Sequence, residues 1–223
     1  MVDGELPRER VMLTIGPHKV NCGSLTSPEL DSMLAGERVD ILYSDPPWGD
    51  GNLAYWQTMN RKMTGAETPQ VKHDELYDRI MGLVRTYVDG YVFIETGLRW
   101  KDYVIQRFLN AGLVRLASFP LTYKSGSKLM ENVLVSASCS LLLPHFSFNP
   151  CPYRGAELVR RVVGSVARPG GIVLDPCCGM GYTARAAVAA GMRFRGNELN
   201  QARLDKTIAF LRKSTNLLPG ELL

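Results

Sequence analysis

Short apolar, strand-forming runs alternate with helix-forming segments along most of this chain, and this alternation limits the folds open to it. The runs at 39–44 and 90–96 carry apolar residues on both faces, which is typical of strands buried within a parallel sheet. Alternating strands and helices predict an α/β fold, with a mostly parallel sheet covered by helices on both faces. With 45% hydrophobic residues in 223, we expect residues 1–223 to form a single domain.

Local patterns place the individual elements. The expected strands are 18–25, 39–44, 90–96, 113–124, 132–138, 171–181 (running into a glycine loop) and 192–198. The expected helices are 28–36, 74–88, 101–112, 153–167, 182–191 and 201–214. The strands at 113–124 and 132–138 predict an antiparallel hairpin at one edge of the sheet. We expect a long loop over 49–73, either a lid or a substrate-recognition loop.

Asp45-Pro46-Pro47-Trp48 follows directly after the buried strand at 39–44. In open α/β sheets, ligands bind at this carboxyl end of the strands. The prolines donate no N–H, so the Pro46 carbonyl can be an acceptor, Asp45 offers a second acceptor, and Trp48 offers a stacking face. Two acceptors and a flat face suit an exocyclic amine on a heterocycle flipped out of a nucleic acid. The simpler alternative is a proline-terminated strand with a buried tryptophan.

A second candidate site lies where the run at 171–175 enters a glycine-bearing turn. Gly179 and Gly181 allow a ligand to approach the backbone, and Glu198 falls 23 residues after Asp175, close to the spacing of an acid that binds a ribose. The segment lacks both the full dinucleotide fingerprint and the lysine of a phosphate-binding loop. Asp175 would repel a phosphate but suits an amino group or a sulfonium, which favours an S-adenosylmethionine pocket over a glycine turn of purely structural use.

Together, Asp45-Pro-Pro-Trp48 and the segment from Val173 through Gly181 with Glu198 resemble the catalytic and cofactor motifs of amino-methyltransferases that act on adenine N6. The catalytic motif comes 130 positions before the cofactor motif, as in the permuted, beta-class DNA adenine methyltransferases. The resemblance implies a Rossmann-like, S-adenosylmethionine-dependent methyltransferase fold with circularly permuted motif order. No insert between 140 and 145 provides a separate target-recognition domain.

The resemblance also implies roles for particular residues. Asp45 and the Pro46 carbonyl would hold the amine, with Pro47 and Trp48 completing the catalytic motif and Trp48 stacking on the flipped base. The implied cofactor-binding residues are Asp175, Pro176, Cys177, Gly179, Gly181, Thr183 and Glu198. The candidate substrate-binding residues, which could stack on bases or contact phosphates, are Tyr123, Lys124, Tyr55, Trp56, Arg61 and Lys62. Glu95 ends another parallel strand on the ligand side and is a further candidate to line the site.

The implied activity is methyl transfer from S-adenosylmethionine to the N6 amine of adenine in DNA, at a specific site or with relaxed specificity. Aspartate rather than serine at position 45 favours adenine N6 over cytosine N4 in this family. An RNA adenine N6 methyltransferase and a catalytically silent nucleic-acid-binding subunit are the alternatives. A homodimer or a recognition partner could supply target recognition. A restriction–modification, regulatory or phage setting is open.

The distribution of charge and the spacing of the cysteines indicate which binding partners and which cellular compartment suit this chain. Residues 151–223 carry eleven Lys and Arg against five Asp and Glu, a formal +6, whereas residues 1–150 carry −2. The basic part suits an anionic partner or solvated helix faces. The five cysteines show no CxxC spacing, so we expect reduced thiols, no metal site and a cytoplasmic location. No apolar run is long enough for a membrane span.

Overall fold

The computed structural model describes residues 12–65, 71–125, 128–138, 141–146 and 151–215; of residues 123–125 and 128–130 it describes the backbone alone. The strands are β1 (Leu13–Ile15), β2 (His18–Cys22), β3 (Val39–Ser44), β4 (Val88–Gly97), β5 (Arg115–Ser125), β6 (Lys128–Ser138), β7 (Ile172–Asp175) and β8 (Arg193–Glu198). The helices are α1 (Glu29–Leu34), α2 (Asp50–Thr64), α3 (His73–Tyr87), η1 (Leu98–Trp100), α4 (Lys101–Asn110), α5 (Gly155–Val166), α6 (Tyr182–Ala189) and α7 (Gln201–Thr215).

The strands in the described ranges form one mixed sheet in the order β1-β2-β8-β7-β3-β4-β6-β5. The pairs from β2 through β8, β7 and β3 to β4 are all parallel. β6 runs antiparallel to both β4 and β5, which confirms the predicted hairpin at one edge. The short β1, which the sequence analysis did not predict, pairs antiparallel with β2 at the other edge.

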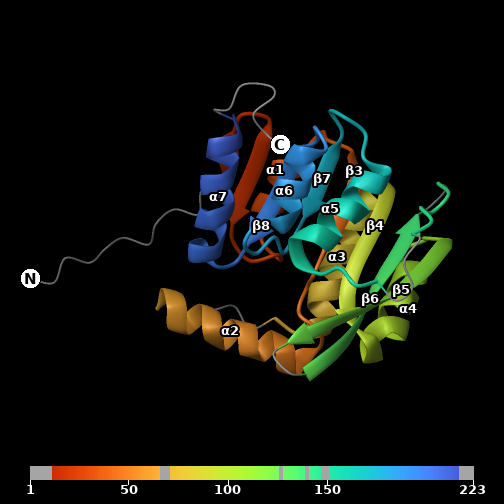
Figure 1. Ribbon diagram of the computed structural model, residues 1–223. Coiled ribbons are helices and arrows are strands. Elements are labelled where there is room, and N and C mark those ends of the chain that lie inside the picture. Colours follow the sequence, from red (N-terminus) through yellow and green to blue (C-terminus); the bar gives the residue numbers. More distant parts are fainter. Residues whose placement is uncertain (1–11, 66–70, 126–127, 139–140, 147–150, 216–223) are drawn as a thin grey trace, which may run out of the picture.

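Helices cover both faces of the sheet, as predicted (Figure 1). α5, α6 and α7 lie on one face, and α1, α3 and α4 lie on the other. The central strands supply apolar side chains to both faces, because successive residues of a strand point in opposite directions. Leu42 packs into the core beneath α1, α3 and α4, whereas its neighbour Ile41 packs into the core beneath α5, α6 and α7.

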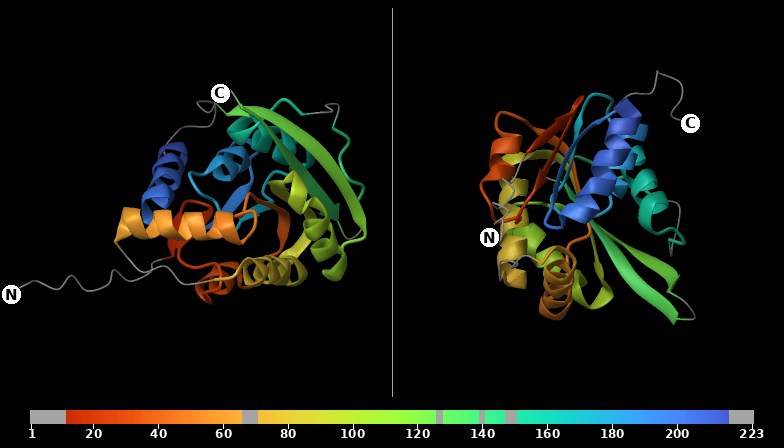
Figure 2. Two further views of the ribbon diagram at one scale, coloured as in Figure 1. Left: turned by 90° about the horizontal axis from the view of Figure 1, so that it is seen from below. Right: turned by 90° about the vertical axis from the view of Figure 1, so that its left-hand side faces the viewer.

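The predicted loop over 49–73 is wrong for most of its length, because Asp50–Thr64 forms helix α2. Glycines with positive φ bound the helix: Gly49 (φ 93°) precedes it, and Gly65 (φ 69°) ends it in the left-handed region. The helix buries only Leu53 and Asn60. Its apolar residues Leu53, Trp56, Met59 and Met63 recur at helical spacing, but this narrow stripe lies among polar residues and lines the cavity, and the sequence analysis missed it. Seen from below, α2 crosses the end of the sheet at which the parallel strands terminate (Figure 2, left).

Two expectations drawn from composition concern cysteines and membranes. No disulfide joins the four cysteines in the described ranges, and Cys139 lies outside them. Within those same ranges, no helix combines the length and the apolar character needed to cross a bilayer.

His18 joins β2 to β8 and gives the fold an acid-sensitive contact. Its side chain is 5% exposed, and its Nδ1 accepts a hydrogen bond from the Phe194 N–H at 3.1 Å. Burial, helped by the positive charge of Arg195, lowers the pKa of His18 from 6.5 to about 4. Between these values the unfolded chain binds a proton that the folded chain does not bind.

We therefore expect the stabilising contribution of neutral His18 to be present above about pH 6.5 and to be lost as the pH falls toward 4. The loss amounts to roughly 2 kcal/mol by about pH 4.5. Urea unfolding of wild type and His18→Asn at neutral and acidic pH measures it, because asparagine keeps an acceptor but does not titrate. The variant should lose less free energy of unfolding on acidification; an equal loss in the two proteins contradicts the assignment.

Candidate cofactor and substrate site

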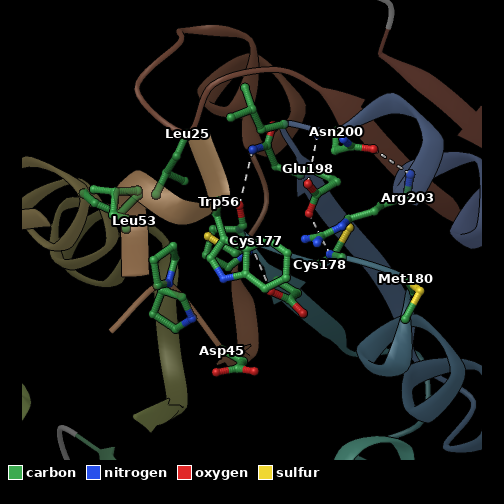
Figure 3. Close-up of a pocket in the computed structure, with 18 of the residues that line it drawn as sticks. Leu25, Asp45, Leu53, Trp56, Cys177, Cys178, Met180, Glu198, Asn200 and Arg203 are labelled. Atoms are coloured by element: carbon green, nitrogen blue, oxygen red, sulfur yellow. Dashed lines mark hydrogen bonds between the residues drawn. The ribbon is translucent and has the colours of Figure 1, made fainter. Parts of the chain in front are cut away.

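One cavity of about 580 Å³ opens at the carboxyl ends of the parallel strands, and Leu53 and Trp56 of α2 line it (Figure 3). Both motifs singled out in the sequence contribute to its walls, although they lie far apart in the chain. The predicted site residues that line it are Asp45, Pro46, Pro47, Trp48, Trp56, Asp175, Pro176, Cys177, Gly179, Thr183 and Glu198. Glu95 also lines it.

The other predicted site residues do not line this cavity or lie outside the described side chains. Tyr55, Arg61 and Lys62 lie on exposed parts of α2, outside the cavity lining. Gly181 is also outside the lining; it precedes α6 with φ 82°, where a Cβ would lie 2.5 Å from Thr207 Oγ1. The side chains of Tyr123 and Lys124 fall outside the part of the chain that the structure describes.

Asp175 ends β7 and ties three elements together. Its Oδ1 accepts hydrogen bonds from the Cys177 N–H at 3.0 Å and the Ser44 hydroxyl at 3.2 Å, and its Oδ2 accepts one from the Thr183 hydroxyl at 2.6 Å. Burial raises the pKa of Asp175 to about 7, although these three hydrogen bonds act in the opposite direction. A cation in the cavity would favour the ionised form.

Glu198, at the end of β8, holds the glycine-bearing turn against the start of α7. Its Oε2 accepts a hydrogen bond from the Gly179 N–H at 2.8 Å, and its Oε1 accepts one from the Asn200 N–H at 2.9 Å. Burial raises its pKa, and the backbone donors oppose that rise. Each carboxylate oxygen can accept a second hydrogen bond, so the cavity side of Glu198 can still receive hydroxyl groups.

Sequence reasoning missed two residues that connect α2 to this part of the cavity. The Arg203 guanidinium lies over the Trp56 ring, 4.0 Å from its centroid, and Asn200 Nδ2 donates to Asn60 Oδ1 at 2.8 Å. Both contacts place α2 beside Glu198 (Figure 3). The position of Asn200, two residues after Glu198, was the one sequence signal that could have placed it at the site. No signal pointed to Arg203, because its partner Trp56 lies on α2, which was not predicted to be a helix.

A hydrogen bond inside the Asp45-Pro46-Pro47-Trp48 turn and packing against neighbouring residues hold this turn in place. The Trp48 indole N–H donates to Asp45 Oδ1 at 2.9 Å, which leaves Oδ2 as an acceptor in the cavity. The Trp48 ring packs over Gly97, where a Cβ would lie 3.2 Å from the ring, and Gly49 rests against the ring of Trp100. The Asp45 side chain is exposed where it lines the cavity, so the protein around it removes only part of its contact with water; this desolvation raises the pKa of Asp45 to about 6, and the hydrogen bond from Trp48 opposes the rise.

The acidic residues converge because the strands that carry them are neighbours. β3 pairs with β7 through Leu42 and Leu174, and with β4 through Ser44 and Ile94. Asp175, Asp45 and Glu95 therefore lie close together at one end of the sheet. Carboxyl groups grouped in this way suit a ligand that carries positive charge and amine hydrogens.

Comparisons with known proteins agree with this geometry. A family model described as DNA methylase matches residues 151–209, which cover β7, α6 and β8 with flanking parts of the chain. No match was found among curated protein sequences.

Solved structures show the fold. The crystal structure of M1.HpyAVI aligns at a TM-score of 0.61 and 16% identity, covering 86% of this chain and 97% of that one. A putative DNA modification methylase from Thermus thermophilus, TTHA0409, aligns at 0.60 and 15%, covering 91% and 97%. PvuII DNA methyltransferase, described as cytosine-N4-specific, aligns at 0.61 and 13%, covering 92% and 89%. The chain therefore has the α/β fold of S-adenosylmethionine-dependent methyltransferases, as expected from the sequence.

Proposed function

We propose that this chain is a DNA methyltransferase that transfers the methyl group of S-adenosylmethionine to the N6 amine of an adenine flipped out of DNA. The observation that carries the proposal is the placement of Asp45 and Pro46 in the same cavity as Asp175 and Glu198. The first pair offers acceptors for an amine, and the second pair offers anionic groups at a glycine-bearing turn. The family match to DNA methylases supports methyl transfer to DNA.

The residues present fit S-adenosylmethionine. Its ammonium and sulfonium are cationic, which suits the acidic end of the cavity near Asp175, and its ribose hydroxyls suit the unused lone pairs of Glu198. M1.HpyAVI and TTHA0409 have each been solved in complex with this cofactor. When bound, the cofactor supplies an electrophilic methyl group on its sulfonium.

The catalytic task of this chain is to present the amine. Asp45 Oδ2 and the Pro46 carbonyl accept its two hydrogens, which favours a pyramidal nitrogen with a usable lone pair, while Trp48 holds Asp45 in place through Oδ1. With S-adenosylmethionine bound, Asp45 and the Pro46 carbonyl would hold the nitrogen in line with the methyl group that the cofactor supplies, and Asp45 would accept the proton that the nitrogen loses on methylation. Positioning and exclusion of water supply most of the rate, since the reaction forms no covalent intermediate with the protein.

Cytosine N4 is a second candidate target, because the fold aligns equally well with the cytosine-N4-specific PvuII enzyme. Asp45 in place of serine favours adenine, by resemblance to the adenine N6 enzymes. The same motif also occurs in RNA adenine methyltransferases, so the nucleic acid class needs a direct test. We propose DNA as the partner because the family match is to DNA methylases.

Transfer of a labelled methyl group to a panel of nucleic acids tests the proposed substrate. Purified protein is incubated with labelled S-adenosylmethionine and with double-stranded DNA, single-stranded DNA or RNA. We expect label in DNA above the level seen with protein heated to unfold it. Label in RNA alone would transfer the proposal to RNA, and cofactor binding without label in any sample would indicate a silent subunit.

Trp56 offers a sharper prediction about α2, because it lines the cavity beside Glu198 whereas its neighbour Tyr55 lies outside the lining. We expect Trp56→Ala to weaken S-adenosylmethionine binding about tenfold, through loss of an aromatic wall worth about 1–3 kcal/mol. Tyr55 packs edge-on against Trp56, so Lys62→Ala, which shortens an exposed side chain of the same helix outside the cavity lining, is the control; it should change the dissociation constant less than about twofold. Isothermal titration calorimetry compares the two variants with wild type; an unchanged dissociation constant in Trp56→Ala would show that Trp56 does not help to form the cofactor site.

A further inference from the structure

Glu95 holds a position beside Asp45 to which the proposed reaction gives no role. The parallel register of β3 and β4 pairs Tyr43 with Phe93 and Ser44 with Ile94, so Glu95 follows on β4 where Asp45 follows on β3. Side chains at matching positions of neighbouring strands point to the same face. Glu95 accordingly lines the same cavity as Asp45, and it is 9% exposed.

A buried hydroxyl fixes the orientation of Glu95. Tyr43, 1% exposed, donates its phenolic O–H to Glu95 Oε1. That oxygen is therefore occupied as an acceptor, and Oε2 is the oxygen left for the cavity. The carboxyl is held by one strand neighbour while its other oxygen remains available to a ligand.

The groups around Glu95 favour its neutral form. Burial is the largest cause, followed by the negative charge of Asp45, and Asp175 adds to it; the hydrogen bond from Tyr43 acts the other way. Cys151 also lies within electrostatic range. Burial first, and then the negative charges of Asp45 and Asp175, raise the pKa of Glu95 to about 8. Because Oε1 accepts from Tyr43, the proton of the neutral carboxyl belongs on Oε2, where it is a donor.

This pattern of donors and acceptors matches one class of base edge. Adenine presents an amine next to the bare ring nitrogen N1, and cytosine presents an amine next to the bare ring nitrogen N3. Guanine and thymine present the reverse, a carbonyl oxygen next to a ring N–H. Asp45 and Pro46 accept from an amine, and a neutral Glu95 beside them donates to the adjacent ring nitrogen. Guanine or thymine would leave buried polar groups unpaired, which strongly disfavours binding.

We propose that Glu95 is a base-selecting residue, which donates a hydrogen bond from its neutral carboxyl to the ring nitrogen beside the target amine, N1 in adenine. The proposal rests on the proposed function and deepens it, because it names the second atom of the target base that the site reads. Asp45 recognises the amine, and Glu95 recognises the ring nitrogen that distinguishes amino bases from keto bases.

Two variants and one base analogue test the contact at neutral pH. Glu95→Ala removes the donor and should lower kcat/KM about 10- to 100-fold. Glu95→Gln keeps an acceptor for Tyr43 and an N–H donor for the base, so it should recover activity to within about threefold of wild type. DNA in which 1-deazaadenine replaces the methylated adenine should lower wild-type kcat/KM by a factor similar to that of Glu95→Ala. In Glu95→Ala, which already lacks the donor, the analogue should lower kcat/KM little further.

The pH profile separates this role from a merely structural one. Wild-type kcat/KM should fall below about pH 6, as Asp45 becomes protonated, and above about pH 8, as Glu95 loses its donor. In Glu95→Gln, kcat/KM should still fall at acidic pH but should no longer fall at alkaline pH, because an amide does not titrate. If the target proves to be cytosine, 3-deazacytosine takes the place of the adenine analogue.

Several results overturn the inference, and they are distinct from failure of the proposed function. The contact does not exist if Glu95→Ala keeps full activity, or if kcat/KM of Glu95→Gln still falls at alkaline pH. It is also excluded if the 1-deazaadenine substrate lowers kcat/KM of Glu95→Ala by the same factor as it lowers kcat/KM of wild type. Thermal unfolding and cofactor titration confirm that each variant is folded. If wild type itself transfers no methyl group, the proposed function fails, and the base-selecting role fails with it.

Discussion

Replacing Asp45 with alanine is expected to lower the rate of methyl transfer at least about 1,000-fold, which corresponds to at least about 4 kcal/mol of transition-state stabilisation. Asp45 Oδ2 is the acceptor that the cavity offers to the amine, because Trp48 occupies Oδ1. Without it, one amine hydrogen has no partner and the nitrogen is no longer held for attack. Asp175 and Glu198, the residues proposed to contact the cofactor, lie on other strands, so cofactor affinity should change less than about threefold.

Single-turnover methyl transfer and cofactor titration, run on the same preparation, measure the two quantities separately. Asp45→Asn is the matched control for packing: it keeps the shape of the side chain but has a single acceptor oxygen, which cannot serve both the Trp48 N–H and the amine. We expect it to be almost as slow as the alanine variant. More than about a tenth of wild-type activity in Asp45→Ala would mean that the amine is held elsewhere.

The second large effect is expected at Glu198, where alanine should weaken S-adenosylmethionine binding at least about 100-fold. The substitution removes the acceptor proposed for the ribose. It also leaves the Gly179 and Asn200 N–H groups without their carboxylate partner, so the glycine-bearing turn and the start of α7 lose the group that joins them. Each unpaired buried donor costs about 1–3 kcal/mol.

Glu157→Ala provides the comparison, since this glutamate pairs with Arg160 and Arg161 on the exposed side of α5. It should leave cofactor affinity within about twofold of wild type. Calorimetric titration gives the dissociation constants, and urea unfolding shows how much of any loss comes from a weakened fold. Normal affinity in Glu198→Ala would remove Glu198 from the cofactor site.

Strong periodicity explains why most of the fold was predictable. The strand at 39–44 was predicted with the bounds that it has, and the helix at 74–88 is observed as His73–Tyr87, because buried apolar residues recur there at the spacing of each element. α2 has only a narrow apolar stripe, of which Leu53 alone is buried, and β1 is only three residues long. Both depend on tertiary contacts that local sequence does not contain.

The candidate site was predictable in its residues but not in their connections. Asp45, Asp175 and Glu198 were singled out from motifs, and the structure brings all three to one cavity. The bond from Trp48 to Asp45 depends on how the turn folds back on itself, and the anchoring of Asp175 depends on Ser44 from another strand. The place of α2 beside the cavity depends on the contact between Arg203 and Trp56. The spacing of residues along the chain predicts none of these three contacts.

Nucleoside mass spectrometry of DNA treated with this protein and methyl-deuterated S-adenosylmethionine tests the central claim most directly. The predicted result is deuterated N6-methyldeoxyadenosine in DNA incubated with wild type and none in DNA incubated with Asp45→Ala. The deuterium label identifies the cofactor as the methyl source, and the modified nucleoside identifies the amine that the Asp45-Pro46 turn holds. N4-methyldeoxycytidine would reassign the target base. The absence of any methylated nucleoside, from folded protein that binds the cofactor, would contradict the account.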